Sequence, residues 1–175
     1  SQCGHHPRRL MVRMKEEQFD DVIRINLKGA LQHAAAVRCD DDAREAGPYY
    51  QYFFHRRLRP DISQIAYGTS KAAINYMTKL IAVQAARDNI RCNAVLPGMT
   101  ATDAVKDNLS DDFREFFLKH TPIRRMGEPE EIAAAVVYFA SDDAAYTTGQ
   151  IMDVSGGFGM PTPVYGDMIE RTDRR

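Results

Sequence analysis

Helix-type and strand-type apolar patterns alternate through the second half of this chain, and this alternation limits the fold more than any other feature of the sequence. The spacing predicts helices over residues 67–89, 110–119 and 128–141 and strands over 90–96 and 149–154. The first strand is a short β-branched run that stops at Pro97-Gly98, as a buried strand followed by a turn does. Strands separated by helices favour a parallel sheet, so we expect an α/β fold with helices on both faces of the sheet.

The first half carries one clear helical pattern. Apolar residues from Phe19 to Ala36 recur at helical spacing behind an acidic first turn, which predicts a helix over residues 15–37. The helix over 67–89 has an apolar band broad enough for burial on more than one side. With 175 residues, of which 44% are hydrophobic and 27% charged, the chain is expected to form a single domain over residues 1–175.

The charge balance restricts the partners. A formal net charge of -1 leaves no excess of Lys and Arg to neutralise phosphates, so we expect a small-molecule substrate and neither nucleic acid nor membrane. No apolar run reaches membrane-spanning length, and the polar stretch Ser1 to Arg9 lacks the apolar core of a signal peptide. The 3 cysteines stand at unrelated spacings, which fits a reducing compartment, and we expect a cytoplasmic protein.

Tyr67 and Lys71 combine a phenol and an ammonium four residues apart at the start of the second predicted helix. Residues at this spacing lie on one helical face, one turn from each other. A free phenol, with a pKa of about 10, is a poor acid at neutral pH, and a neighbouring cation favours the phenolate. The pair is therefore a candidate acid/base couple, although by itself a solvated pair on a helix surface accounts for the same spacing.

Four stretches of sequence around this pair share one pattern, namely Arg13 to Gly29, Ile65 to Ile74, Asn93 to Gly98, and Pro122 to Gly157. They resemble the short-chain dehydrogenase/reductase family, and the matching text covers nearly the whole chain. The resemblance implies a Rossmann-like fold in which Tyr67 is the acid/base. It also implies that Lys71 binds the nicotinamide ribose and that Asn26 holds a water of the proton relay.

The same resemblance implies a cofactor, NAD or NADP. Pro97 and Gly98 match the strand end and turn that lie beside the nicotinamide in the family, and Thr100 and Thr102 stand where the family contacts its carboxamide. We therefore expect Tyr67, Lys71 and these four residues to bind the cofactor. No metal site is expected.

Other interpretations exist for single residues. The Asn26 side chain could bond a backbone carbonyl of its own helix, and Thr102 could be a helix cap before Asp103. His5 and His6 with Cys3 could suggest a metal site, but the sequence offers no second cluster to complete it.

Two features depart from the family. No glycine-rich fingerprint for a dinucleotide pyrophosphate occurs in the sequence, so we expect the chain to be the carboxyl-terminal part of one Rossmann domain, lacking the amino-terminal cofactor-binding half. The family also places a catalytic Ser thirteen residues before its Tyr, and this position is Phe54 here. A phenyl ring cannot donate the hydrogen bond that polarises a substrate carbonyl.

A shifted reading frame would account for both departures in part. Codons compatible with residues 49–59, read one base later, can encode Ile-Ile-Asn-Ile-Ser-Ser-Thr-Ala-Gly-Tyr, which is the missing strand and serine of the family. Codons for residues 2–9 similarly yield Asn-Ala-Gly-Ile-Thr-Arg-Asp, the missing strand end. We therefore expect that residues 1–9 and 38–59 are either read in a shifted frame relative to a functional ancestor or wrongly recorded for a normal protein.

Taken together, these patterns predict an NAD(P)-dependent oxidoreductase that interconverts a secondary alcohol and a ketone. The sequence from Gly156 to Gly166 resembles hydroxysteroid dehydrogenases, whereas Leu10 to Gly29 is more similar to 3-oxoacyl carrier-protein reductases. A catalytically inactive fragment or oligomerisation module is the alternative of another class. The helices 15–37 and 67–89 resemble those through which family members form dimers and tetramers.

Residues 102–120 are a candidate lid over an apolar substrate. The segment carries Phe113, Phe116, Phe117 and Leu118. A plain amphipathic helix accounts for the same spacing.

Overall fold

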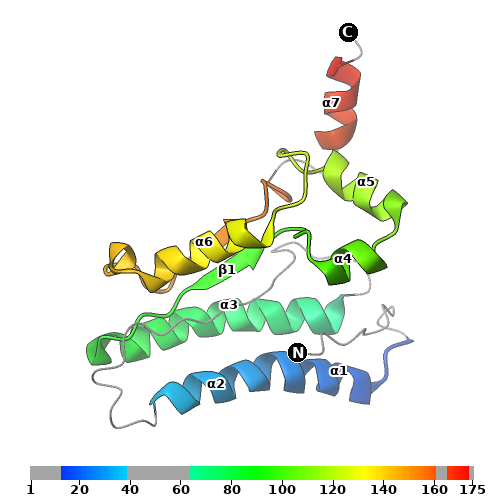
Figure 1. Cartoon of the computed structure of the whole chain (residues 1–175). Helices are drawn as coiled ribbons and strands as arrows, with labels where there is room; N and C mark the ends of the chain where they lie inside the picture. Colours follow the sequence, from blue (N-terminus) through cyan, green and yellow to red (C-terminus); the bar gives the residue numbers. More distant parts are fainter. Residues whose placement is uncertain (1–12, 39–63, 161–164, 174–175) are drawn as a thin grey trace.

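Two parallel strands lie between layers of helix in residues 13–38, 64–160 and 165–173, the part of the chain that the computed structural model describes (Figure 1). The elements are α1 (Glu16–Ile23), the π-helical turn η2 (Arg24–Lys28), α2 (Gly29–Arg38), α3 (Ile65–Ala85), the 3₁₀ turn η4 (Ala86–Asp88), β1 (Ala94–Pro97), α4 (Asp103–Asn108), α5 (Asp111–Lys119), α6 (Pro129–Ala140), the 3₁₀ turn η5 (Asp142–Ala144), β2 (Ile151–Val154) and α7 (Tyr165–Asp173). Strand β1 pairs in parallel with β2, in a register that opposes Ala94 to Ile151. The predicted parallel pairing is therefore confirmed.

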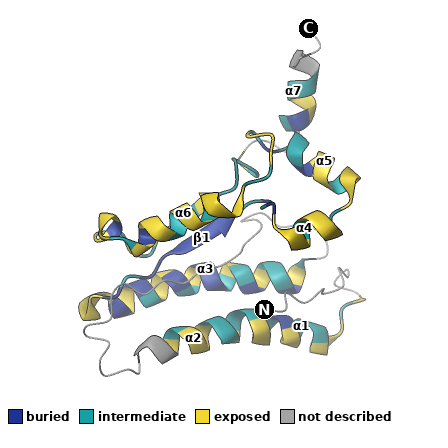
Figure 2. Ribbon diagram, in the orientation of Figure 1, coloured by how far each residue is buried: buried dark blue, intermediate teal, exposed yellow. Residues whose placement is uncertain are grey.

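Consecutive residues of β1 face opposite helical layers. Ala94 is fully buried against Ile74 of α3. The next residue, Val95, packs on the other side against Phe139 of α6 and Ala144. Because successive side chains of a strand alternate, α3 and α6 cover the two faces of the sheet (Figure 2). This arrangement confirms the predicted α/β class with helices on both faces.

Side-chain hydrogen bonds fix the chain just before β1. The Arg91 guanidinium donates to three backbone carbonyls between residues 139 and 147, at 2.9 to 3.3 Å. The Asn93 amide is buried, donates to one of these carbonyls at 2.9 Å, and accepts from the Gln150 N–H at 2.9 Å. The strand therefore begins at Ala94 and not at the predicted residue 90, because the residues before it are held by side chains instead of the sheet ladder.

Other helix and strand ends also differ from the predicted ones. The second strand begins at Ile151 instead of residue 149, because Gly149 has a φ of 71° and sits in a turn. Helix α3 ends at Ala85 instead of residue 89, and the 3₁₀ turn that follows it closes with Asn89 in the left-handed region. The predicted helix over 15–37 is continuous in direction but contains the π-helical turn η2, which no residue pattern indicated.

Three helix starts follow the expected capping chemistry. Ser110 accepts from the backbone N–H of Phe113 ahead of α5, and Pro129 occupies the first turn of α6. Thr102 caps α4 in the same way as Ser110 caps α5. Helix α4 was anticipated only by the alternative interpretation of Thr102 as a cap, and α7 was not predicted.

The segments of the frame-shift prediction, residues 1–9 and 38–59, lie outside the described part, apart from Arg38 at the end of α2. Phe54, which stands where the family has its catalytic Ser, lies outside it as well. The cysteine and histidine residues of the first six positions also lie outside it. Among the helices that the structure describes, none combines the length and apolar composition needed to cross a lipid bilayer.

Candidate active site

Tyr67 and Lys71 stand together on the first two turns of α3. The Lys71 Nζ lies 5.4 Å from the centroid of the Tyr67 ring. Both side chains are half-buried, so each is partly open to solvent and partly packed against the fold. The predicted proximity of phenol and ammonium is therefore present in the structure.

This pair lies level with the carboxyl end of β1. Ile74 of α3 packs against Ala94 of β1, and the two elements run in opposite directions (Figure 1). From Ile74 back to Tyr67 the helix advances about 10 Å at roughly 1.5 Å per residue. From Ala94 forward to Pro97 the strand advances about 10 Å at roughly 3.3 Å per residue. The first turns of α3 and the predicted nicotinamide edge therefore reach the same height.

Asn26 reaches the same helix from the π-helical turn η2. Its Nδ2 donates to the Ser70 Oγ at 3.0 Å, and the Ser70 Oγ donates to the Tyr67 carbonyl at 2.7 Å. The hydrogen bond that the structure gives Asn26 is thus to a side chain of another helix, and not to a carbonyl of its own helix. Ser70 was missed by sequence reasoning, although its place directly before Lys71 could have indicated it.

Pro97 is the last residue of β1, and Gly98 after it comes close to Ser155, the residue after β2. The Gly98 N–H donates to the Val154 carbonyl at 3.0 Å. A Cβ at Gly98 would lie 2.6 Å from the Ser155 Cα, so this close approach requires glycine. The backbone beside this strand end is therefore held in one place by both strands.

Thr100 and Thr102 follow in the loop after β1. The Thr100 hydroxyl donates to the Gly98 carbonyl at 3.3 Å, and Thr100 also bridges to Gly127. The Thr102 Oγ1 accepts from the Val105 N–H at 3.4 Å as the cap of α4. The cap interpretation of Thr102 is thus confirmed. Its predicted contact with a carboxamide stays a prediction.

The aromatic residues of the candidate lid are divided between core and surface. Phe117 is buried and stacks on Phe158 with ring centroids 4.1 Å apart. Phe116 is exposed and lies against His120 at 4.8 Å. The amphipathic-helix interpretation accounts for this division, and the lid stays a prediction.

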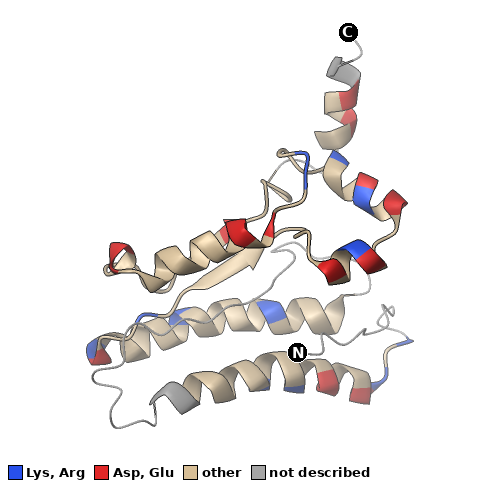
Figure 3. Ribbon diagram, in the orientation of Figure 1, with Lys and Arg blue, Asp and Glu red and all other residues tan. Residues whose placement is uncertain are grey.

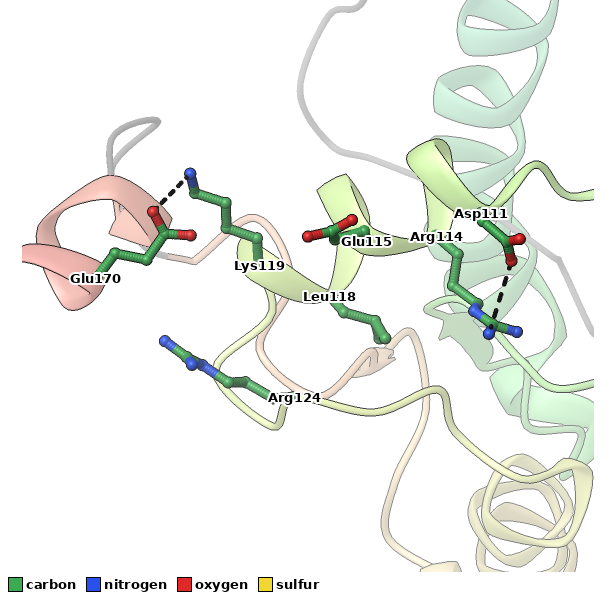
Figure 4. Close-up of a pocket in the computed structure, with 7 residues that line it drawn as sticks. All are labelled: Asp111, Arg114, Glu115, Leu118, Lys119, Arg124 and Glu170. Atoms are coloured by element: carbon green, nitrogen blue, oxygen red, sulfur yellow. Dashed lines mark hydrogen bonds and ion pairs between the residues drawn. The ribbon is translucent and has the colours of Figure 1, made fainter. Parts of the chain in front are cut away.

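A separate pocket opens between α5 and α7 (Figure 4). It has a volume of about 610 Å³ and is lined by Asp111, Arg114, Glu115, Leu118, Lys119, Arg124 and Glu170. Lys119 Nζ lies 2.7 Å from Asp167 and 3.1 Å from Glu170, and the hydrogen bonds that it donates to these two carboxylates raise its pKa. This pocket contains none of the predicted catalytic or cofactor residues, so it is not the candidate active site.

Two further kinds of chemistry lack support among the described residues. Cys92 is fully buried, and this burial raises the pKa of its thiol to about 12, so the thiolate that nucleophilic chemistry needs is not formed near neutral pH. The described residues also contain no cluster of three or more His, Cys, Asp or Glu side chains that could hold a metal ion.

Known protein families, proteins and solved structures include relatives of this chain. A family described as enoyl-(acyl carrier protein) reductase matches residues 2–159. The 7alpha-hydroxysteroid dehydrogenase of Clostridium sardiniense is 56% identical over 112 residues, which are 64% of this chain and 43% of that protein. The 3-oxoacyl-[acyl-carrier-protein] reductase of Thermotoga maritima is 37% identical over 148 residues, which are 85% of this chain and 60% of that protein.

A solved structure shares the fold over most of the length of this chain. It is a 7 alpha-hydroxysteroid dehydrogenase complexed with NADH and 7-oxo glycochenodeoxycholic acid, with a TM-score of 0.78 and 28% identity. The match covers 89% of this chain and 60% of that one. The chain therefore spans 43% to 60% of the length of these three relatives.

Proposed function

The chain belongs to the short-chain dehydrogenase/reductase family, and from this premise we propose that it serves an NAD(P)-dependent oxidoreductase that interconverts a secondary alcohol and a ketone. The observation that carries the proposal is the Tyr67 and Lys71 pair, 5.4 Å from ring centroid to Nζ, at the height of the strand end of β1. Ligands of open parallel sheets bind beside the carboxyl ends of the strands, and this is where the pair stands.

The donor groups at this edge fit the nicotinamide end of a dinucleotide. Lys71 offers an ammonium for ribose hydroxyls, while the threonine hydroxyls at 100 and 102 and the backbone near Gly98 offer partners for a carboxamide. For the pyrophosphate we assign no residue, because the sequence has no glycine-rich fingerprint. The choice between NAD and NADP is left to experiment.

In the proposed reaction the residues of this chain move a proton. A nicotinamide cofactor, when bound, would supply or accept the hydride. The Tyr67 phenol gives its proton to the substrate oxygen during reduction and takes one back during oxidation. The Lys71 ammonium stabilises the phenolate that remains, and Asn26 orients the water through which the proton is replaced.

A steroid alcohol is the proposed substrate class. The support is that two of the relatives described above are named for 7α-hydroxysteroids, together with the hydroxysteroid-like sequence after Gly156. The exposed ring of Phe116 lies on α5, the helix of the candidate lid, and gives an apolar ligand a surface to meet. A 3-oxoacyl thioester is the alternative substrate, because a carrier-protein reductase matches 85% of the chain.

A substrate test separates these possibilities. Reduction of 7-oxo glycochenodeoxycholic acid and of a 3-oxoacyl thioester, each with NADH and with NADPH, is followed by loss of the reduced nicotinamide. We expect turnover of the steroid by the whole protein, whereas this chain by itself has no glycine-rich fingerprint for the dinucleotide and is expected to be inactive. Tyr67→Phe should lower kcat by about 10²- to 10⁴-fold, the range of general acid catalysis. Tyr146→Phe, on a fully exposed ring, is the matched control and should keep wild-type turnover.

A second candidate, from another class, is a catalytically inactive module for assembly. Large apolar side chains are exposed on the two long helices, namely Leu31, Tyr76, Leu80 and Val83, at 46% to 78% exposure. Charged residues are sparse on α2 and on most of α3 (Figure 3). Either candidate is proposed to form a dimer or tetramer through helices 15–37 and 67–89, in the cytoplasm.

Cofactor binding discriminates the two candidates. The enzyme requires saturable binding of NADH or NADPH, whereas the assembly module requires only self-association. Calorimetric titration with each dinucleotide, together with sedimentation of the same sample, measures both properties. Self-association without dinucleotide binding would favour the module and would contradict the oxidoreductase.

A further inference from the structure

We infer that Ser70 is a positioning residue of the proposed active site, which holds the side-chain amide of Asn26 in one orientation. The inference rests on the function proposed for Tyr67 and Lys71. It concerns a residue that makes no contact with the reacting atoms and acts through Asn26.

Ser70 is placed to connect two helices. Its side chain is fully buried, and its Oγ accepts from Asn26 Nδ2 at 3.0 Å. The same oxygen donates to the Tyr67 carbonyl, three residues earlier in α3, at 2.7 Å. One hydroxyl therefore joins the backbone of Tyr67 to an amide that is 44 residues away in sequence.

The number of protons on this hydroxyl fixes the direction of the amide. A serine hydroxyl carries one proton, and Ser70 gives it to the Tyr67 carbonyl, which can only accept. Only lone pairs are left to face Asn26, so the NH₂ end of the Asn26 amide must point at Ser70. The Asn26 side chain is thereby held against α3 in one orientation, and with it the π-helical turn that carries this residue.

The helix around Asn26 explains why an outside anchor is needed. Asn26 is the middle residue of the five-residue π-helical turn Arg24–Lys28, at whose end the Gly29 N–H donates to the Arg24 carbonyl. Such a turn interrupts the regular i to i−4 ladder, and these turns occur often at functional sites. The buried hydroxyl on α3 supplies the side-chain partner for the residue at the centre of this turn.

Ser70 also stands between the two proposed catalytic residues in sequence. It lies one turn after Tyr67 and directly before Lys71, on a helix that is continuous from Ile65 to Ala85. Any shift of this turn therefore moves the phenol, the ammonium and the anchor of Asn26 together. This coupling keeps Asn26 aligned with the acid/base pair.

The first test needs no turnover. Nuclear magnetic resonance of the full chain measures how fast the Asn26 side-chain amide protons exchange with water. Ser70→Ala should speed this exchange by about fivefold to tenfold and shift both resonances, because one hydrogen bond is lost. Ser70→Cys, which keeps the volume with a weaker acceptor, gives the same direction of change if Ser70→Ala does not fold.

Thr78→Val is the matched control. Thr78 is also fully buried in α3, and its hydroxyl donates to the Ile74 carbonyl four residues earlier at 3.0 Å. Its removal should leave the Asn26 resonances and exchange rate as in the wild type. Unchanged Asn26 resonances in both Ser70 variants would overturn the inference.

The second test concerns the reaction. In turnover of the steroid substrate, Ser70→Ala and Asn26→Ala should each raise the solvent deuterium isotope effect on kcat, because proton delivery becomes slower. The double variant should show no larger effect than the stronger single variant, since both changes break one connection. Additive effects, or a wild-type isotope effect in Ser70→Ala, would contradict the positioning role. Absence of turnover in the wild type would refute the proposed function instead, and with it the catalytic part of the inference, while the exchange measurement still decides the contact.

Discussion

Replacing Gly98 by alanine should destabilise the fold at the strand end that the proposed cofactor edge needs. The added Cβ would stand 2.6 Å from the Ser155 Cα and 2.9 Å from the Ser155 carbonyl oxygen. Both are backbone atoms, so no side-chain rotation relieves the contact. Gly98 does not have a positive φ, and the cost therefore comes from space alone.

The size of the effect follows from two contributions. Forcing extra atoms into a filled site costs about 1 to 3 kcal/mol. The shift needed to clear Ser155 also lengthens the bond from the Gly98 N–H to the Val154 carbonyl, now 3.0 Å, at a cost of about 1 kcal/mol. Gly98→Ala should thus lower the free energy of unfolding by about 2 to 4 kcal/mol. For a chain of this length the midpoint of thermal unfolding falls by about 4 to 16 °C.

A second glycine supplies a control of opposite sign. Apart from its chain neighbours and the backbone of its own helix, no heavy atom of the described residues lies within 4 Å of the position that a Cβ would take at Gly68, which stands inside α3. Gly68→Ala should therefore stabilise the chain by about 0.5 to 1 kcal/mol through helix propensity. Urea unfolding followed by circular dichroism measures both variants against the wild type. A Gly98→Ala variant as stable as the wild type would refute the reasoning from the contact with Ser155.

Four further predictions address other parts of the molecule. Both polar side-chain atoms of Asn75 are buried with no hydrogen-bond partner among the described residues. Asn75→Leu should therefore raise the free energy of unfolding by about 1 to 2 kcal/mol in urea unfolding, and a lower value would point to an unrecognised partner. The hydrogen bonds that Arg125 donates lower the pKa of Glu131 from 4.5 to about 2. The ionised Glu131 carboxylate therefore stabilises the folded state above pH 4.5, and this stabilisation is lost as pH falls towards 2. The stability difference between wild type and Glu131→Gln should shrink over this range and in high salt, and a constant difference would contradict the ion pair. Cys92, with its thiol pKa raised to about 12 by burial, should resist alkylation in the folded chain and react after unfolding, as peptide mass mapping would show; rapid labelling of the folded chain would disprove its burial. The gene should encode Ile-Asn-Ile-Ser-Ser when the codons of residues 49–59 are read one base later, and any other reading ends the frame-shift proposal.

Features set by short stretches of chain could be predicted from the sequence. The alternation of helices and strands follows from apolar periodicity, and it is present in the parallel pair β1 and β2 between α3 and α6. Residues four apart on a helix share a face, so the approach of Lys71 to Tyr67 was fixed before any packing occurred. The Ser110 cap is equally local.

Features that join distant segments could not be predicted in this way. The contact of Ser70 with Asn26 spans 44 residues, and the bonds of Arg91 to the carbonyls after α6 span 48 to 56. Helix α7 lies beside α5 (Figure 1), and Lys119 of α5 forms ion pairs with Asp167 and Glu170 of α7. Figure 4 shows the pair of Lys119 and Glu170. No local pattern encodes these partners.

The sequence by itself determined the class of fold, the capped helix starts and the phenol–ammonium pair, because each depends on the repeat of one helix or strand. Only the tertiary structure decided that Ser70 anchors Asn26, that the first strand begins at Ala94, and that Gly98 must be bare of a side chain. These depend on which surfaces meet when the helices close over the sheet, and the choice among possible partners is made by packing space and by the need of buried polar groups for hydrogen bonds.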